Sequence, residues 1–173
     1  MGKLLACLLT AVCAAYVYSY IPPWVVWNEK TEALPANPGL IEGTVTLKDR
    51  QVVYASDDGA LWKTDPSWKI SDMMIEDIDD DGWCEIVMLS WTRGQYGDYQ
   101  PVYEKPNRWK YTQRLYIFNL YEDRLQAQWM SSQLKPQVRS WQIKDGLICL
   151  TDASGDTTVW KWQGRSPAIV DRE

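Results

Sequence analysis

The sequence predicts an all-β domain that follows an apolar segment at the N-terminus. Within residues 40–173, short runs rich in β-branched and aromatic residues alternate with turn residues such as Asp-Gly, which is the pattern of antiparallel strands. Similar runs return in a similar order further along the chain. The composition fits this class, because 11 Trp and 10 Tyr accompany a single Phe, and Trp and Tyr suit strand surfaces and interfaces better than a purely apolar core.

Residues 1–27 form the N-terminal segment. Lys3 is followed by an uncharged run, residues 4–21, that a Pro-Pro pair ends. A short basic start and an apolar run make an export signal, and this run is long enough to span a bilayer as a helix. Either signal peptidase cuts near residues 13–15 and the domain is secreted, or the helix stays as a transmembrane anchor with the domain outside the cytosol. Aromatic residues at its far end favour the anchor, because they match the aromatic belt of membrane helices: Tyr16, Tyr18, Tyr20, Trp24 and Trp27.

Residues 28–39 are predicted to be a linker and residues 40–173 the β domain. The linker is polar and interrupted by prolines. In the domain, Asp57-Asp58-Gly59 supplies the positive φ angles that a hairpin turn needs. The run that starts at Asp156 is predicted to open a further hairpin that the chain does not complete. Strands are expected at residues 44–47, 51–55, 60–64, 73–75, 85–91, 114–119, 125–130, 138–143, 147–150 and 156–162.

An acidic stretch, residues 77–85, has the pattern of a loop that binds a cation. Its carboxylates stand at loop positions 1, 3, 5 and 9, and Gly82 follows the third. Ca²⁺ takes about six to eight oxygen ligands, and alternate side chains of a tightly turned loop can all point inward where glycine permits the turn. Without a cation these carboxylates would repel one another, so the alternative, an acidic turn solvated by water, is disfavoured. The predicted ligands of Ca²⁺ are Asp77, Asp79, Asp81, Trp83 and Glu85.

This stretch begins like an EF-hand loop but does not continue as one. Position 12 is Met88, where an EF-hand needs a bidentate Glu. Residues 85–91 form a nearly continuous apolar run that is typical of a strand buried on both faces, and residues 73–75 enter the loop in the same way. The sequence therefore predicts a cation site between two strands.

Residues 75–87, Ile-Glu-Asp-Ile-Asp-Asp-Asp-Gly-Trp-Cys-Glu-Ile-Val, resemble the calcium loops of the FG-GAP or VCBS repeats of integrin-like β-propellers. Those repeats carry an apolar strand, the pattern D-x-D-x-D-G-x-x-[DE] and a second apolar strand, and the resemblance covers residues 71–91. It implies propeller blades, a structural Ca²⁺ and binding through loops. Residues 138–150 look like the same unit without its carboxylates, with Asp145-Gly146 standing where Asp81-Gly82 stands in the first unit.

The resemblance implies blades of antiparallel strands, and the chain after the linker has material for about three of them. Trp62, Trp129 and Trp160 recur at similar positions in the units, which favours a core role for these side chains. Propellers close with about four to eight blades, so an incomplete or unusually small ring is expected here. Strand edges left open in such a ring invite a protein partner or self-association.

The composition also bears on the class of function. The chain has no histidine, which removes the commonest general base and the usual partner of a catalytic Ser or Cys. It has no G-x-S-x-G motif and no phosphate-binding glycine loop, so we expect no enzymatic activity. The net charge of −5 argues against a nucleic-acid partner. Cys84 and Cys149 are expected to be free thiols, the alternative being a bridge that needs their Cα atoms within about 7 Å.

A long irregular segment, residues 93–112, is the predicted contact region for a partner, because loops of this length in small domains are usually functional or mobile. The sequence as a whole predicts a membrane-anchored, extracytoplasmic, calcium-binding interaction module, either an adhesion protein or an accessory subunit of a membrane complex. The alternative is a carbohydrate-binding module whose long segment stacks aromatic rings on a glycan. The candidate binding residues of this segment are Tyr96, Tyr99, Tyr103 and Trp109.

Overall fold

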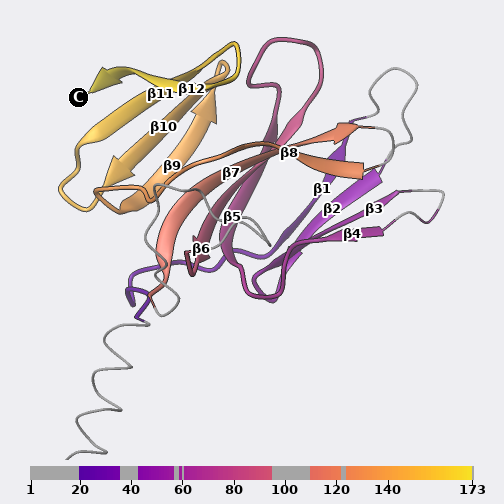
Figure 1. Ribbon diagram of the computed structural model, residues 1–173, viewed down its shortest axis with the longest axis horizontal. Coiled ribbons are helices and arrows are strands. Elements are labelled where there is room, and N and C mark those ends of the chain that lie inside the picture. The colour runs from indigo at the N-terminus through magenta and orange to yellow at the C-terminus, as the bar shows by residue number, and fades with distance from the viewer. Residues whose placement is uncertain are drawn as a thin grey trace, which may run out of the picture.

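The computed structural model describes residues 20–35, 43–56, 59, 61–94, 110–121 and 124–172 (Figure 1). In these residues, twelve strands form three four-stranded antiparallel sheets, and the strands of each sheet are neighbours in the same order as in the chain. The all-β class is therefore confirmed. The expected N-terminal helix lies mostly outside the described residues, and among those described no helix is long and apolar enough to cross a membrane.

Each sheet is a meander of four strands. The first sheet holds β1 (Lys30–Leu34), β2 (Gly43–Lys48), β3 (Gln51–Ser56) and β4 (Leu61–Lys63). The second, central sheet holds β5 (Lys69–Glu76), β6 (Glu85–Thr92), β7 (Thr112–Tyr121) and β8 (Arg124–Met130), and within it residues 93–111 connect β6 to β7. The third sheet holds β9 (Val138–Lys144), β10 (Leu147–Asp152), β11 (Thr157–Gln163) and β12 (Ser166–Arg172).

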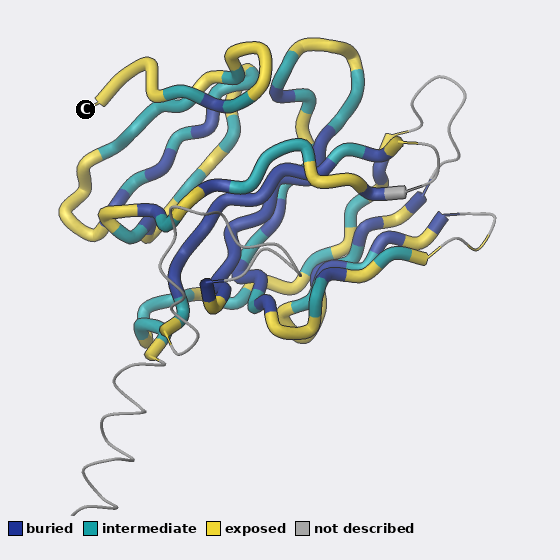
Figure 2. Tube along the Cα trace, viewed as in Figure 1, coloured by how far each residue is buried: buried dark blue, intermediate teal, exposed yellow. Residues whose placement is uncertain are grey.

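The central sheet is covered on both faces (Figure 2). Alternate side chains of a strand point to opposite faces, and β6 uses both. Ile86 and Met88 pack with the first sheet, whereas Val87 and Leu89 pack with the third. Every residue of β6 is buried, as its apolar sequence predicted. Burial of each such large apolar side chain contributes roughly 1.5–3 kcal/mol to folding, so the central sheet supplies much of the stability.

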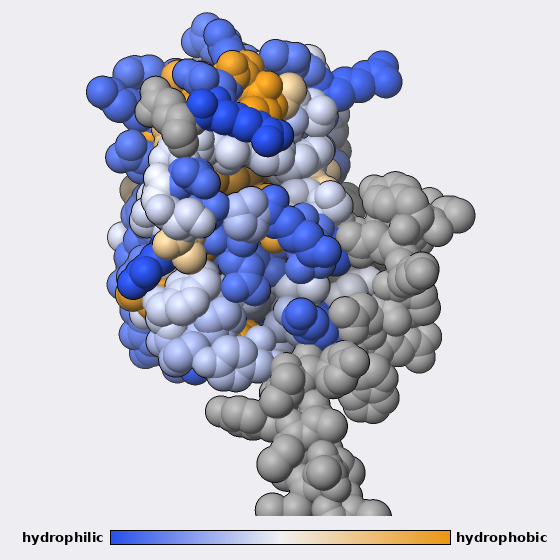
Figure 3. Space-filling model, turned by 90° about the vertical axis from the view of Figure 1, so that its left-hand side faces the viewer, coloured by the Kyte–Doolittle hydropathy of each residue, from blue (hydrophilic) through white to orange (hydrophobic). Residues whose placement is uncertain are grey.

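The outer sheets each have one polar face. On β2, Val45 and Leu47 point into the core while Thr44 and Lys48 are exposed. On β9, the outward positions are likewise exposed and polar, and the face of the molecule seen in Figure 3 is mostly hydrophilic, with an apolar patch at its top. Neither outer sheet therefore presents a second apolar core face among the described residues.

Part of the predicted linker is a strand. Lys30–Leu34 forms β1 and pairs antiparallel with β2, so the domain begins before residue 40. The backbone N–H of Asn28 also donates to the carbonyl of Ser71 at 3.0 Å. The prediction of a linker over residues 28–39 is wrong at these positions. An edge strand on a solvent-facing sheet needs few apolar side chains, so its polar sequence gave no strand signal.

Two aromatic residues of the predicted membrane belt contact the domain. The ring of Trp24 packs edge-on against the buried Trp91, with ring centroids 6.4 Å apart. The guanidinium of Arg50 lies 4.2 Å from the centre of the Trp27 ring. Residues 20–28 are thus held against the β domain.

The third hairpin of the C-terminal region is complete, which corrects the prediction that the chain leaves it unfinished. The strand β11 pairs antiparallel with β12 from Thr158↔Arg172 to Gln163↔Ser166. Gly164, with φ of +70°, makes the turn. Pro167 lies within β12, and a proline argues against a strand in the sequence. Proline is nevertheless tolerated in an edge strand, because one side of such a strand needs no hydrogen bonds.

Candidate metal centre

The acidic loop joins β5 to β6 in the central sheet and lies at the opposite end of the domain from residue 20 (Figure 1). The loop winds around Asp77. Its Oδ1 atom accepts a hydrogen bond from the N–H of Asp80 at 2.8 Å, and its Oδ2 atom accepts one from the N–H of Gly82 at 2.9 Å. Asp80 and Gly82 both have positive φ, +61° and +86°, which gives the chain its tight turn.

Three carboxylates converge at this loop. One oxygen from each of Asp77, Asp79 and Glu85 lies within 4.8 Å of the others. Glu85 is the first residue of β6 and only 1% exposed, so the strand fixes its position. Its Oε2 atom accepts a hydrogen bond from the N–H of Ile78 at 3.1 Å. The carboxylates thus come from both ends of one loop and meet at its base.

A glutamine from β8 completes the cluster. The Nε2 atom of Gln128 donates to Oδ2 of Asp79 at 2.9 Å. In the pairing of β7 with β8, Ile117 faces Trp129 and Phe118 faces Ala127, so Gln128 is the extra residue of a bulge. Bulges re-aim side chains, and this one directs Gln128 toward the acidic loop.

Two oxygen atoms here are buried without a hydrogen-bond donor in the described part of the chain. They are Oδ1 of Asp79 and Oε1 of Gln128. A buried polar atom left without a partner costs roughly 1–3 kcal/mol. Carboxylate and amide oxygens are the ligands that hard divalent cations prefer, so a cation at this place would satisfy atoms that the protein leaves unsatisfied.

The negative charges of the carboxylates at this site repel one another. Burial, together with the negative charges of neighbouring loop aspartates, raises the pKa of Glu85 to about 8, and the hydrogen bond from Ile78 opposes this rise. Burial also raises the pKa of Asp79, as do the charges of Asp81 and Asp77, while the Gln128 hydrogen bond lowers it. Burial, then the same acidic surroundings, raises the pKa of the Cys84 thiol. The cluster therefore carries more negative charge than its partly buried position favours.

The structure brings together the side chains of three of the five predicted ligands, Asp77, Asp79 and Glu85, and the carboxylate of Asp81 lies outside this group. The side chain of Asp81 is turned along the loop, where its Oδ1 atom accepts a hydrogen bond from the N–H of Trp83 at 2.8 Å. Gln128 was missed by the sequence analysis. It lies 49 residues from Asp79, and no local spacing indicates which strand residue a bulge will expose to a distant loop.

The third sheet supports the acidic loop from one side. The turn Asp145-Gly146 joins β9 to β10, the first two strands of the third sheet. The acidic loop likewise joins the first two strands of the central sheet. A side chain added at Gly146 would lie 3.8 Å from the carbonyl oxygen of Asp77 and 3.9 Å from that of Ile78. Ile78 itself is buried in the core between the central and third sheets. The base of the loop is therefore packed.

The other predicted positions are distributed as follows. Trp62 on β4 and Trp129 on β8 both lie on the last strand of their sheets, but Trp160 lies on β11, the third strand. All three pack against a core, as expected. Cys84 and Cys149 are free and partly buried. The aromatic residues proposed for partner or glycan contact lie outside the described residues: Tyr96, Tyr99, Tyr103 and Trp109.

No protein-family model matches the chain, and no curated protein is similar to it at a significant level. The chemistry of the candidate site is that of oxygen ligands from carboxylates and an amide, in a chain without histidine. Such a set binds a hard cation such as Ca²⁺ or Mg²⁺.

Proposed function

We propose that this chain is a non-catalytic, calcium-binding interaction module held at the extracytoplasmic face of a membrane by residues 1–27. The observation that carries the proposal is the convergence of Asp77, Asp79 and Glu85 around an Asp79 oxygen that has no donor among the described residues. A divalent cation would balance the negative charge of these carboxylates and would also be a partner for the unpaired Asp79 oxygen.

Ca²⁺ fits this site better than Mg²⁺. Two of the carboxylates belong to an irregular loop, and one side of that loop, at Asp80 and Asp81, is exposed to solvent. Ca²⁺ accepts flexible arrangements of six to eight oxygens that include water, whereas Mg²⁺ demands a near-ideal octahedron. Outside the cytosol, calcium is abundant enough for sites of modest affinity, with Kd of about 10⁻⁴–10⁻³ M.

The cation would act as a clamp within the central sheet. Asp77 and Asp79 belong to the loop, Glu85 to β6, and Gln128 links the loop to β8. This role agrees with the resemblance to FG-GAP and VCBS repeats. Three successive four-stranded antiparallel sheets, with cores between neighbours, support a blade-like interpretation in which the acidic loop joins the first two strands of the second blade.

The proposed partner is a protein, or a second copy of the chain, at an open strand edge. Leu61 on β4 is 71% exposed, and Ile169 and Val170 on β12 are 39% and 46% exposed. Both strands are edges of their sheets. Exposed apolar side chains on an unpaired edge favour strand addition.

Calcium titration of the purified full chain by isothermal calorimetry tests the metal assignment. We expect the protein to bind one Ca²⁺ per chain, and Asp79→Asn to weaken binding by about 100-fold or more, since it removes a charged ligand. Asp156→Asn, in the β10–β11 connection of the third sheet and far from the loop in sequence, is the matched control and should bind calcium as the unmodified chain does. Equal binding by Asp79→Asn and the unmodified protein would contradict the proposal.

Membrane attachment and partner binding are tested on the same chain in its native membrane. We expect the chain to resist carbonate extraction and to dissolve only in detergent. A native gel of that extract should show a species larger than one chain. Release of the chain by carbonate would contradict the anchor, and a single-chain species would contradict the partner.

A further inference from the structure

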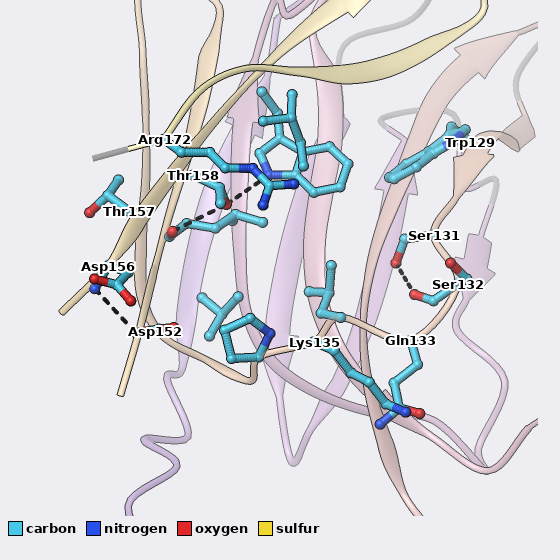
Figure 4. A pocket seen from close by; sticks show the side chains of 16 residues that line it. Trp129, Ser131, Ser132, Gln133, Lys135, Asp152, Asp156, Thr157, Thr158 and Arg172 are labelled. Atoms are coloured by element: carbon cyan, nitrogen blue, oxygen red, sulfur yellow. Dashed lines mark hydrogen bonds between the residues drawn. The ribbon is translucent and has the colours of Figure 1, made fainter. Parts of the chain in front are cut away.

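A cavity of about 590 Å³ lies between the β8–β9 connection and the outer end of the third sheet (Figure 4). Ligand pockets commonly have volumes of about 300–1,000 Å³. Figure 4 shows Trp129 on one side of the cavity, Arg172 and Thr158 on the other, and Lys135 and Gln133 of the connection below. The lining residues come from β8, from the β8–β9 connection and from all four strands of the third sheet, so the cavity is built by the fold and is separate from the acidic loop.

Two tryptophans give the cavity an aromatic surface. The rings of Trp129 and Trp160 lie 6.3 Å apart with an interplanar angle of 57°, and both side chains are partly exposed. The indole N–H of Trp160 donates to Oγ1 of Thr158 at 3.0 Å. This bond fixes the orientation of the ring before any ligand arrives, which lowers the entropic cost of stacking.

The backbone of β11 and of the β10–β11 turn is already paired where these segments line the cavity. Thr158 pairs with Leu150 on one side and with Arg172 on the other. In the turn after β10, Oδ1 of Asp152 accepts the N–H groups of residues 154, 155 and 156. A ligand in contact with these two segments would therefore be recognised by their side chains, and an open backbone edge of this sheet lies on the outer side of β12.

The polar side chains of the cavity include both acceptors and donors. Asp152, 8% exposed, and Asp156 offer carboxylate oxygens, whereas Arg172 and Lys135 offer N–H donors. Within the described residues the ion pairs involve Lys30 alone, so none of these four groups is neutralised by a salt bridge. Two acids and two bases balance in charge, which favours a neutral ligand that both donates and accepts hydrogen bonds.

We infer that this cavity binds a neutral saccharide. The apolar C–H face of a sugar ring stacks on Trp160, and its hydroxyl groups, each a donor and an acceptor, pair with the carboxylate of Asp156 and the guanidinium of Arg172. The inference goes beyond the calcium-dependent module proposed above and does not depend on the cation. It also places glycan binding at a different position from residues 93–112.

Glycan-array binding by the fluorescently labelled full chain, followed by calorimetric titration of the best glycan, tests the inference. We expect Arg172→Ala and Trp160→Ala each to weaken binding by about tenfold or more, because the first removes a hydrogen-bond donor and the second the stacking surface, each a contact of about 1.4 kcal/mol. Arg165→Ala, an exposed arginine in the β11–β12 turn outside the cavity, is the matched control and should leave affinity unchanged.

Thermal unfolding of each variant shows that a loss of binding is not a loss of folding. Binding should persist in EDTA, so the calcium titration and the glycan titration report on different sites. Three results would overturn the inference: no glycan bound at millimolar concentration, unchanged affinity in both cavity variants, or loss of binding in Tyr99→Ala alone.

Discussion

Two hairpins occupy the same place in neighbouring sheets but are built differently. The β5–β6 and β9–β10 hairpins each join the first and second strands of a sheet. The first is closed by an acidic loop whose carboxylates converge, and the second by the two-residue turn Asp145-Gly146, with φ of +53° and +70°. The two are in contact, since Gly146 faces the carbonyl oxygen of Asp77.

The difference shows what each loop needs in order to close. In the β9–β10 turn, backbone geometry is sufficient, because two successive positive φ angles match the twist of the strands. In the β5–β6 loop, side chains of Asp77 and Asp81 accept backbone N–H groups, and the remaining charges are left close together. The β9–β10 turn thus closes through its backbone, whereas the β5–β6 loop also gathers the carboxylates at which we propose that a cation binds.

The largest expected effect is a pH dependence that arises in the acidic loop. In EDTA the pKa of Glu85 is about 8 in the folded protein, against 4.5 for an ordinary glutamate. The folded state therefore holds the proton more tightly, and this stability is present below about pH 4.5 and lost as the pH rises through about 8. We expect the free energy of unfolding in EDTA to fall by roughly 2–4 kcal/mol over that interval.

Urea denaturation at a series of pH values measures this fall. Glu85→Gln should flatten the profile, because its amide does not titrate. Calcium should also flatten it, since the cation competes with the proton for the same carboxylate. A profile that is equally steep in Glu85→Gln would assign the pH dependence to another group.

Asp79→Asn should lower stability by about 2 kcal/mol in excess calcium, because binding to the native state alone stabilises it by mass action. In EDTA the same substitution should leave stability unchanged or slightly raised, because it removes charge repulsion and keeps an oxygen for the Gln128 hydrogen bond. Chemical denaturation in both conditions separates the two effects, with Asp156→Asn as the control. Equal losses in calcium and in EDTA would show that Asp79 does not bind a metal.

Gly146→Ala tests the β9–β10 hairpin, whose turn has no cluster of carboxylates. At φ of +70° an alanine is strained, and the cost is roughly 1–2 kcal/mol. The loss should be the same in calcium and in EDTA. Gly164→Ala is a close match, since Gly164 has the same φ and nothing within 4 Å of an added side chain. A calcium-dependent loss at Gly146 but not at Gly164 would show that the two hairpins are coupled through the metal.

The smallest effect is expected for Asp81→Asn. Asp81 caps the N–H of Trp83 within the loop, and an asparagine oxygen can do the same. We expect less than about 1 kcal/mol of lost stability and a reduction in calcium affinity of only a few-fold through the lost charge. A loss of calcium binding as large as that of Asp79→Asn would place Asp81 among the ligands after all.

The sequence was informative where one local pattern decides the structure. The apolar run of β6 and the spacing of Asp77, Asp79 and Glu85 predicted the strand and the cluster, because both depend on the positions of neighbouring residues. Strands β1 and β12 were missed, since edge strands facing solvent tolerate polar residues and proline.

The detailed geometry of the loop could not be predicted in the same way. Asp81 has the correct spacing for a ligand, but its carboxylate is used by the backbone of Trp83. Gln128 reaches the site only because β8 bulges against β7. Both outcomes depend on how distant segments pack, which no short pattern encodes.

Thermal unfolding of the full chain in EDTA and in millimolar Ca²⁺ is the most direct test of the central claim, that the carboxylates of the β5–β6 loop hold calcium. Circular dichroism should show a clear rise in the unfolding midpoint of the unmodified protein with calcium and no rise in Asp79→Asn. An unmodified protein whose midpoint is the same in EDTA and in calcium would contradict the claim and leave the loop as a solvated acidic turn.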